Sequence, residues 1–390
     1  MIRLSNARSI SGRDFKADGE GNDLFFDSDI NMIVAKPESC SDVQDLDCTG
    51  CDLTPGFFDS HIHGAFGYDC SDASAEDIVS LSRRLPECGV SAFLPTTMTI
   101  EKERIYRVFD AVSRAVEILD KDIKPHAAVS GIHLEGPFLN PSMSGVQKTG
   151  NLILPKNGTA LIEDLEKRFP GLLKIIDVAP ELDGAMQFTE EFSGRYVLSA
   201  AHTDCDYDTA MDFFARGGKS VTHILNATSP CLKRAPGILG AVFDSPGVFA
   251  EVICDGHHIV PAMLRIISRL IGDRVIVVSD SMRGAGMPDG FYDLGGTEVE
   301  VRCGRTYYGP GGSLAGSVTS LACECRELVS CGIPHSEVYD ALTKTPYDRL
   351  GIKCPTLDAG GRADINVIDG SGRLRNVICR GKFVTPDIMI

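Results

Sequence analysis

Two histidines separated by one residue follow an apolar run near the start of the chain. His61 and His63 lie in the segment PGFFDSHIHG, residues 55–64. On an extended strand, residues two apart point to the same side, so both imidazoles could grip one metal ion. Two incidental histidines beside a glycine turn are the simpler explanation. The position directly after an apolar run, with Asp59 as a candidate hydrogen-bond acceptor for the ligands, favours a metal site.

Three further groups suited to metal binding follow other apolar runs. They are Glu135 in HLEGPF, His202 in AHTD and His223 in THILNA. A buried carboxylate is costly unless it is paired or bound to metal, whereas either histidine alone could be an ordinary core residue. Two imidazoles and one carboxylate together leave an open coordination position, which a hydrolytic metal site requires. His133, two residues before Glu135, is predicted to lie deeper and to be structural.

Asp280 follows the last apolar run and stands in the segment SDSM. It could simply cap the segment after it. Beside a divalent ion, however, a carboxylate can take a proton from water and pass it to a leaving amine. These residues predict metal-assisted hydrolysis with Asp280 as the catalytic acid and base. The ligand types suit one or two divalent ions per chain, with zinc expected and iron or manganese as alternatives.

Eight short apolar runs alternate with segments of helical periodicity, such as Lys102–Leu119, and together they must position these residues. Such alternation predicts a parallel sheet covered on both faces, and eight units favour a closed (β/α)8 or TIM barrel. The candidate residues follow the carboxyl ends of the runs, where the active site of such a barrel lies. The predicted strands are Leu53–Phe58, Val90–Leu94, Val129–Leu134, Leu173–Val178, Tyr196–Ala200, Ser220–Thr222, Val248–Cys254 and Val275–Ser279.

The two ends of the chain have a different pattern, with short alternating strands. They predict the N-terminal part (1–52) and the C-terminal part (356–390) of one small β-sandwich, on either side of a hydrolase barrel over 53–355. Examples of the predicted strands are Asp23–Phe26, Ile30–Ala35, Asp364–Ile368 and Asn376–Val384.

The charge balance limits the possible partners. The 390 residues carry a formal net charge of −16, which repels nucleic acid and anionic membranes, so neither is an expected partner. An anionic substrate would therefore need a locally basic pocket. We find no apolar leader or membrane-spanning stretch and expect a cytoplasmic protein whose 14 cysteines are mostly reduced.

Taken together, these segments resemble the N-acetylglucosamine-6-phosphate deacetylases of the amidohydrolase superfamily. PGFFDSHIHG, HLEGPF, AHTD, THILNA, NATSPCLKRAPG, DGHH, SDSM and LAGS occur in that family's order, over about residues 53–320. The set is highly specific, although no single motif is. The resemblance implies that Glu135, His202 and His223 hold the principal ion and that Asp280 is the acid/base. It further implies that the sugar phosphate is held by Asn226, Ala227, Arg234 and His258, and that the backbone around Leu314, Ala315 and Gly316 lines the substrate site.

The resemblance also implies a homodimer, because in that family a phosphate-binding residue reaches across from the neighbouring subunit. Arg234 or His258 is the candidate for this role here. At one position the chain departs from the family, which usually has Gly-Ala-His twelve residues after the metal-binding glutamate. This chain has Gly145-Val146-Gln147. Glutamine can donate a hydrogen bond to the acyl carbonyl of a substrate but cannot carry a proton.

The expected function is hydrolysis of N-acetylglucosamine 6-phosphate to glucosamine 6-phosphate and acetate, in amino-sugar catabolism. One alternative is a deacetylase of another N-acyl hexosamine phosphate, such as N-acetylgalactosamine 6-phosphate. A second is a catalytically impaired sugar-phosphate-binding relative, which only Gln147 supports. A hydantoinase or dihydroorotase would carry a carboxylated lysine at the end of the fourth strand, where this chain has Asp177-Val-Ala-Pro180.

Overall fold

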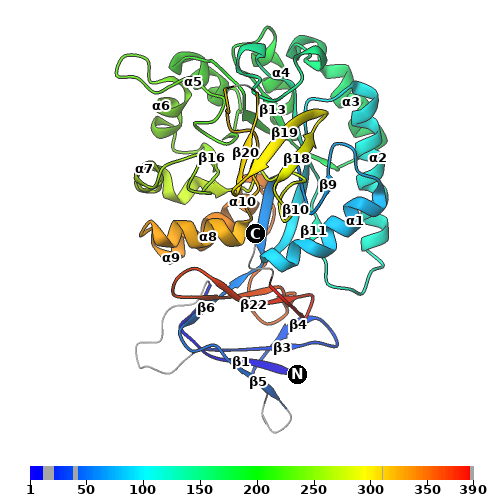
Figure 1. Ribbon diagram of the computed structural model, residues 1–390, viewed down its shortest axis with the longest axis vertical. Helices are drawn as coiled ribbons and strands as arrows, with labels where there is room; N and C mark the ends of the chain where they lie inside the picture. Colours follow the sequence, from blue (N-terminus) through cyan, green and yellow to red (C-terminus); the bar gives the residue numbers. More distant parts are fainter. Residues whose placement is uncertain (12–21, 38–42, 310, 387–390) are drawn as a thin grey trace.

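A ring of parallel strands surrounded by helices dominates the computed structural model, which describes residues 1–11, 22–37, 43–309 and 311–386 (Figure 1). All neighbouring strands of this sheet pair in parallel, and the short β11 (Ala128–Val129) adds to β10. The ring strands are β7 (Phe57–Ile62), β10 (Val90–Thr97), β12 (Ile132–Phe138), β13 (Leu173–Val178), β14 (Val197–Ala200), β15 (Ser220–Val221), β16 (Phe249–Val252) and β17 (Val275–Val277).

Hydrogen bonds just beyond the last strand connect it to the first. The backbone N–H of Asp280 donates to the carbonyl of His61 over 3.0 Å, and the N–H of His63 donates to the carbonyl of Ser281 over 2.9 Å. These bonds bring the residues after β17 beside β7, so the sheet is nearly closed. The predicted (β/α)8 barrel is confirmed.

Helices pack around the outside of the barrel. The predicted helix over Lys102–Leu119 is α2, whose buried residues include Ile105, Val108, Phe109 and Val112 at spacings of one, three and four. Within the described residues, no helix is both long enough and apolar enough to cross a lipid bilayer. The α-helices of the described residues are α1 (Ala75–Arg84), α2 (Lys102–Leu119), α3 (Thr159–Arg168), α4 (Ala185–Phe192), α5 (Tyr207–Ala215), α6 (Gly237–Asp244), α7 (Pro261–Ile271), α8 (Leu321–Ser330), α9 (His335–Leu342) and α10 (Lys344–Leu350).

The run predicted as the first barrel strand, Leu53–Phe58, belongs to two strands. Its first part lies in β6 (Cys51–Pro55), which pairs with strands outside the barrel, and its second part begins β7. Gly56 separates them, and a Cβ atom there would lie 2.4 Å from the Cβ of Ser91. The chain passes too close to β10 at this point for any larger residue. The predicted domain limits stay a prediction, and this arrangement favours a first boundary at Gly56.

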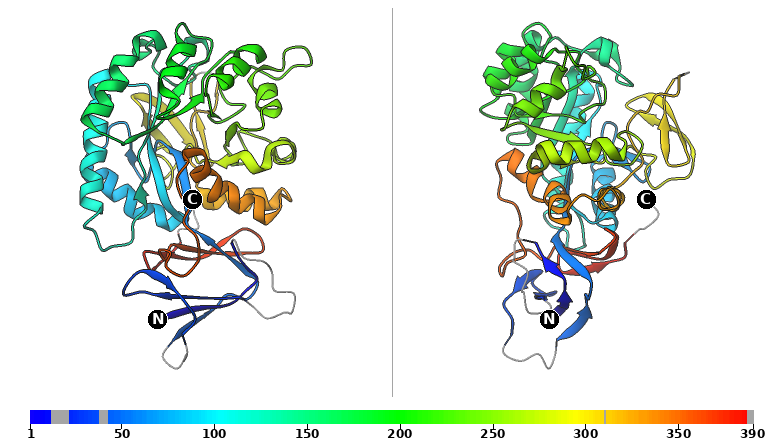
Figure 2. Two further views of the ribbon diagram at one scale, coloured as in Figure 1. Left: turned by 180° about the vertical axis from the view of Figure 1, so that it is seen from behind. Right: turned by 90° about the vertical axis from the view of Figure 1, so that its left-hand side faces the viewer.

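The two chain ends form a β-sandwich at one end of the barrel (Figures 1 and 2). One sheet has the order β4-β3-β1-β5 and the other β2-β6-β21-β22-β23. Their apolar faces share a core that includes Leu4, Phe26, Leu53, Ile365 and Ile378. The strands are β1 (Ile2–Ala7), β2 (Ser9–Ile10), β3 (Asn22–Asp27), β4 (Met32–Val34), β5 (Gln44–Asp47), β21 (Ile365–Asp369), β22 (Leu374–Cys379) and β23 (Lys382–Val384).

A further sheet, antiparallel throughout, lies between β17 and α8 in the chain, and the sequence patterns did not predict it. It consists of β18 (Gly290–Leu294), β19 (Thr297–Arg302) and β20 (Arg305–Tyr307), and it projects from the barrel in the right-hand view of Figure 2. Its tip approaches the loop after β12, because the hydroxyl of Thr297 donates to the carbonyl of Val146 over 3.4 Å. The small hairpin β8 (Gly64–Ala65) and β9 (Tyr68–Asp69) follows β7.

Candidate metal centre and active site

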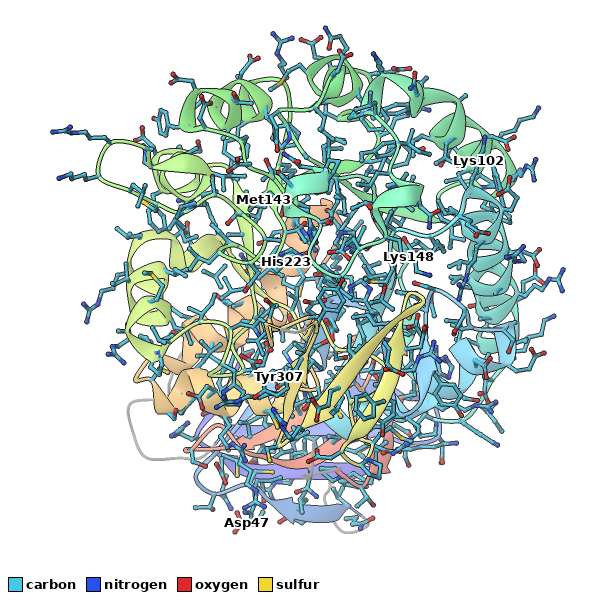
Figure 3. All side chains as sticks on the ribbon, turned by 45° about the horizontal axis from the view of Figure 1, so that its top comes forward. Asp47, Lys102, Met143, Lys148, His223 and Tyr307 are labelled. Carbon is cyan, nitrogen blue, oxygen red and sulfur yellow. The ribbon has the colours of Figure 1, made fainter. Side chains whose placement is uncertain are left out.

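A cavity of about 380 Å³ opens at the carboxyl ends of the barrel strands. Figure 3 places His223 inside the ring of helices and Lys102 at its outer edge, where α2 begins. Of the fourteen predicted site residues, the structure brings twelve to the wall of this cavity; His61 lies behind the wall, and Arg234 lies elsewhere. The twelve are His63, Glu135, Gln147, His202, His223, Asn226, Ala227, His258, Asp280, Leu314, Ala315 and Gly316.

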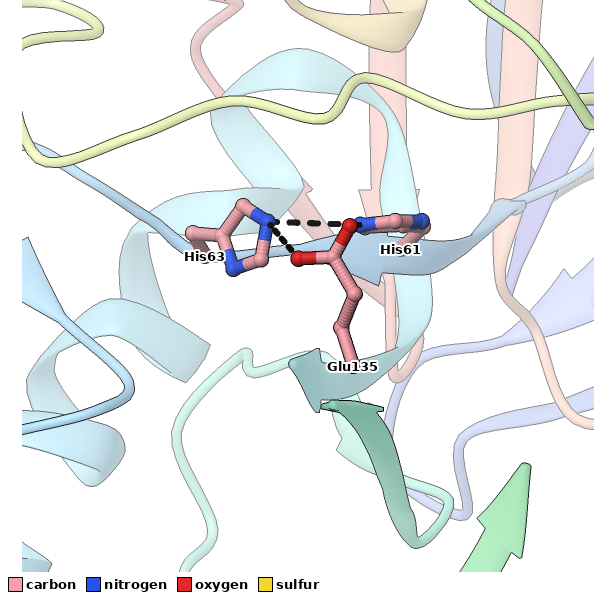
Figure 4. A group of neighbouring side chains, drawn as sticks. All are labelled: His61, His63 and Glu135. Carbon is pink, nitrogen blue, oxygen red and sulfur yellow. Dashed lines mark hydrogen bonds and ion pairs between the residues drawn. The ribbon is translucent and has the colours of Figure 1, made fainter. Parts of the chain in front are cut away.

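Glu135 lies at the centre of the predicted ligand set. Its Oε1 is 3.1 Å from Nε2 of His202 and 3.0 Å from Nε2 of His223. Its Oε2 is 3.2 Å from Nε2 of His63, whose ring lies beside that of His61 (Figure 4). The carboxylate therefore stands between two pairs of imidazoles, and each pair forms with it a compact group of potential ligands. This arrangement can hold one ion on each side of Glu135.

The other ring nitrogens show which atoms are available to bind a metal. Nδ1 of His61 faces a carboxylate oxygen of Glu251 at 2.9 Å, while Nδ1 of His63 and of His202 face backbone carbonyls at 3.2 and 2.8 Å. Oxygens of this kind only accept, so each Nδ1 carries a proton and each Nε2 is the ring nitrogen left to bind a metal. Those Nε2 atoms converge on Glu135, so the residues present fit a divalent cation.

Asp280 lies beside the His61–His63 pair. Its Oδ1 is 3.2 Å from Nε2 of His63 and 3.5 Å from Nε2 of His61. Because Asp280 also lines the cavity, its carboxylate can reach a substrate and the ion-binding groups at once. This placement suits the predicted acid/base, a role that stays a prediction.

The cluster of imidazoles keeps both carboxylates ionised. Burial opposes ionisation, but the nearby His63, His202 and His223 hold the pKa of Glu135 well below its usual range. Burial also opposes ionisation of Asp280, whose pKa is lowered by its hydrogen bond to His63 and by the charge of His61. Conversely, although burial favours the neutral ring, Glu135 raises the pKa of His223 to about 9. A metal ion would replace those imidazolium protons as the compensating positive charge.

Four of the predicted site residues have strained backbones, and Ala227 is one of them, with a φ angle of 50°. The other three, His202, His223 and Asp280, lie two or three residues after short barrel strands, and their φ angles are 44°, 26° and 46°. A residue with a side chain in this region costs about 1–3 kcal/mol, and such residues gather at functional sites. The left-handed turn ends each strand abruptly as its side chain enters the ligand cluster. The strain therefore marks this end of the barrel as the functional one.

Gln147 lies against Glu135, with both ends of its amide bonded to the protein. Its Oε1 accepts a hydrogen bond from the backbone N–H of Thr99 over 2.6 Å, which fixes the orientation of the amide. Its Nε2 then donates to Oε2 of Glu135, also over 2.6 Å. Gln147 lines the cavity, but these contacts direct its donor to a ligand carboxylate. Its predicted role in binding substrate stays untested.

The cavity contains little positive charge of its own. His258 lines it, but Nδ1 of that ring donates to Asp255 over 2.8 Å. Arg234 is exposed on the loop between β15 and α6 and does not line the cavity. Among the described residues, no lysine or arginine lines the cavity wall. The positive charge that a phosphate requires must come from elsewhere.

A buried polar layer fills the barrel beneath the ligand cluster, and sequence reasoning missed its principal members. Glu251 on β16 faces His61, and Arg349 on α10 pairs with the other oxygen of Glu251. A glutamate inside the apolar strand segment FAEV was a usable signal, since charged residues are rarely fully buried without a partner. Nothing in the sequence indicates that Arg349 is buried in the barrel, because its partners Glu251 and Ser60 are distant in the chain.

The predicted role of Asp59 beside the histidines is wrong. Its carboxylate accepts hydrogen bonds from the hydroxyl and the backbone N–H of Ser279, at 2.6 and 3.3 Å. It touches His61 only through that residue's backbone N–H, at 3.4 Å. The prediction that His133 is structural agrees with its position, since its ring is fully buried and Nε2 lies 3.0 Å from Asp177.

Comparison with known proteins gives a consistent result. Residues 53–384 match the Amidohydrolase family. The chain is similar to N-acetylglucosamine-6-phosphate deacetylase from Bacillus subtilis (strain 168), with 33% identity over 338 residues that cover 85% of this chain and 84% of the relative. It is also similar to N-acetylgalactosamine-6-phosphate deacetylase from Escherichia coli O157:H7, with 27% identity over 85% of this chain and 88% of that relative.

A solved structure extends the likeness to nearly the whole chain. An N-acetyl-D-glucosamine-6-phosphate deacetylase from Mycobacterium smegmatis, an aspartate-to-alanine variant in complex with N-acetyl-D-glucosamine-6-phosphate, superposes with a TM-score of 0.87. It is 26% identical, and the match covers 98% of each chain. The likeness includes the sandwich as well as the barrel.

Proposed function

Because this chain belongs to the amidohydrolase family, and within it to the N-acetylglucosamine-6-phosphate deacetylases, we propose that it hydrolyses N-acetylglucosamine 6-phosphate to glucosamine 6-phosphate and acetate. The observation that carries the proposal is the convergence of Glu135, His202 and His223 with Asp280 on one cavity. Amide hydrolysis needs a polarised carbonyl, an activated water and a proton donor for the amine, and this cavity provides residues for all three.

Glu135, His202 and His223 would hold the principal divalent ion, which when bound polarises the amide carbonyl and makes water more acidic. We propose zinc, with iron or manganese as alternatives. His61 and His63 offer ligands for a second ion on the other side of Glu135. Both side chains are almost fully buried.

Asp280 moves the proton in the proposed reaction. Its ionised Oδ1 accepts a proton from the attacking water, and the carboxyl group then returns that proton to the nitrogen of the departing amine. Its backbone is held by the bond from its N–H to the carbonyl of His61. The backbone of Asp280 is therefore held beside the strand that carries His61 before substrate enters.

We propose a homodimer in which Arg234 contributes to the phosphate site of the partner subunit. The cavity lacks a lysine or arginine within the described residues, and Arg234 is exposed on a loop away from its own cavity. The neighbouring Leu232 is 57% exposed, which suits a loop that packs against another chain. Guanidinium groups bind phosphate in a bidentate manner, so Arg234 has the chemistry that the site lacks.

A cytoplasmic location is part of the proposal. Within the described ranges, no two cysteines form a disulfide with each other, which suits a reducing compartment. The substrate class points the same way, since sugar phosphates are intracellular metabolites.

The test is a screen for acetate release from purified protein loaded with Zn²⁺. The substrates are N-acetylglucosamine 6-phosphate, N-acetylgalactosamine 6-phosphate and unphosphorylated N-acetylglucosamine, and the control protein is Asp280→Asn. We expect the highest kcat/KM for N-acetylglucosamine 6-phosphate and little release without the phosphate. Absence of acetate release from all three substrates would contradict the proposed function.

A second substrate is favoured by two observations. Gln147 stands where the family usually has histidine, next to the expected position of the acyl group, and one relative is named an N-acetylgalactosamine-6-phosphate deacetylase. A higher kcat/KM for the galactosamine epimer in the same screen would assign that activity. The intact ligand set and Asp280 argue against a relative that binds sugar phosphates without hydrolysing them.

A further inference from the structure

His61 differs from the other candidate ligands in the group that holds its second nitrogen. His63 and His202 each donate from Nδ1 to a backbone carbonyl, of Thr96 and of Met143. Nδ1 of His61 instead lies 2.9 Å from Oε2 of Glu251. A carboxylate acceptor orients an imidazole and makes its free nitrogen a stronger metal ligand than a carbonyl acceptor does.

Glu251 is itself held in place by Arg349. The guanidinium of Arg349 donates from Nη1 to Oε1 of Glu251 and from Nη2 to the hydroxyl of Ser60 over 2.6 Å. Both charged side chains are fully buried inside the barrel. Ser60 directly precedes His61 on β7, so Arg349 braces both the strand that carries His61 and the carboxylate that orients its ring.

The same atoms are close enough to suggest a separate metal site. His61, His133 and Glu251 form a group whose potential ligand atoms lie within 4.8 Å of one another. Arg349 already places a positive charge on Glu251, and Nδ1 of His61 must be protonated to bond to that carboxylate. A cation would have to displace that proton and approach the guanidinium. The group therefore acts as a support for His61 and not as a binding site.

We infer that Glu251, braced by Arg349, is the positioning residue that makes His61 a metal ligand and so determines whether a second ion binds at His61 and His63. The inference rests on the metal centre of the proposed function. The ligands of the two ions are oriented by different groups. His202 donates from Nδ1 to a backbone carbonyl and has no contact with Glu251 among the described residues. Changing Glu251 should affect one ion and not the other.

The experiment compares the wild-type protein with Glu251→Gln, an isosteric change that weakens the acceptor. Protein stripped with a chelator is equilibrated with buffered free Zn²⁺, and bound zinc per chain is measured by elemental analysis. We expect two ions in the wild type. In Glu251→Gln we expect the first ion to bind with unchanged affinity and the second to bind roughly 10–100-fold more weakly. Absorption spectra of the Co²⁺ forms would show the loss at the second site independently of activity.

The matched control is Glu324→Gln, which changes a fully buried glutamate on α8 that has no hydrogen bond to the four imidazoles among the described residues. It should bind both ions as the wild type does. If Glu251→Gln does not fold, Glu251→Asp retains the charge for Arg349 but retracts the carboxylate from His61, and should weaken the second ion similarly.

Three outcomes would overturn the inference. They are a wild type that binds a single ion, a Glu251 variant with unchanged affinity for the second ion, and a variant in which both ions weaken equally. A wild type that binds no ion would overturn the proposed metal centre as well, so the two failures are distinguishable.

Discussion

Gln147 donates a hydrogen bond from Nε2 to Oε2 of Glu135 over 2.6 Å, while Thr99 holds the other end of its amide. The residue that departs from the family pattern thus touches the carboxylate at the centre of the metal-binding cluster. Its neutral amide restrains Oε2 of Glu135, the oxygen that faces His63. Several predictions for single residues depend on this cluster.

For Gln147→His, we expect two ions per chain and a change of less than about tenfold in kcat/KM for N-acetylglucosamine 6-phosphate. A charge-assisted hydrogen bond is worth about 1.5–3 kcal/mol, but an ion at His61 and His63 already supplies that polarisation. The measurement pairs steady-state kinetics with metal analysis. One ion per chain together with a large gain in activity would contradict this expectation and would point to a different acylated sugar as the substrate.

Glu135→Ala should lose the principal ion. Without the carboxylate, His202 and His223 are left as two imidazole donors, and a divalent ion loses the anionic ligand that lies between them. Zinc is measured after dialysis against buffer without metal, and circular dichroism checks the fold. If the variant retained full zinc occupancy, Glu135 would not be a ligand.

Asp280→Asn should keep the fold and the bound metal but lose most of its turnover. An amide has nearly the same shape as the carboxylate but cannot accept the proton of water, which typically costs about 10²–10⁴-fold in rate. The comparison is kcat at saturating substrate, with zinc content as the control. A kcat near that of the wild type would mean that another group is the base.

Asp52→Asn should destabilise the junction between sandwich and barrel in a manner that depends on pH. Burial opposes ionisation, but hydrogen bonds from Arg8, Ser9 and Tyr339 lower the pKa of Asp52 to about 2. A folded-state pKa below the unfolded value stabilises the protein above about pH 4, and this contribution is lost as pH falls from about 5 to 2.

After discounting for solvent screening, we expect the variant to lose about 1–2 kcal/mol in free energy of unfolding at pH 7. The difference from the wild type should shrink as pH falls toward 3. Urea unfolding at several pH values measures it. If the difference in free energy of unfolding stays constant with pH, the hydrogen bonds of Asp52 and not its charge stabilise the junction.

Arg234→Met should lose activity because phosphate binds more weakly. Activity should return in part when this variant forms mixed dimers with the inactive variant Asp280→Asn. In a mixed dimer with Asp280→Asn, one cavity combines an intact Asp280 with the intact Arg234 of the other chain. Random reassociation makes half the dimers mixed, so activity should return to about a quarter of that of the wild type. A mixture that stays inactive after unfolding and refolding together would rule out a contribution across the interface.

The sequence motifs predicted the site best for residues that are close together in sequence or at the ends of consecutive strands. His61 and His63 stand at the end of one strand, and His202 and His223 come just after two later strands, so the order of strands and the motifs at their ends were enough to predict them together. The helix at Lys102–Leu119 agreed residue for residue, because its apolar spacing is regular.

The parts that were missed depend on contacts that no local pattern encodes. Arg349 reaches Glu251 from a helix about a hundred residues away, as its hydrogen bond shows. The division of Leu53–Phe58 depends on the proximity of Gly56 to Ser91, which follows only from the folded barrel. In the β18–β20 sheet, β19 does alternate, as TEVEVR, and was a usable signal, whereas β18 and the three-residue β20 have no such pattern.

The sandwich has a consequence for how the chain is synthesised. β6 pairs with β21, so a strand that is synthesised early has no partner on one edge until a strand near the C-terminus has been synthesised. Until Ile365–Asp369 leaves the ribosome, Leu53 lacks the part of its core that β21 supplies, and the edge of β6 that pairs with β21 is exposed. An exposed strand edge can pair with another chain and cause aggregation. A partly synthesised chain is open to such pairing until the missing strand is made. A nascent chain stalled before β21 is therefore an aggregation-prone species even after its barrel has folded.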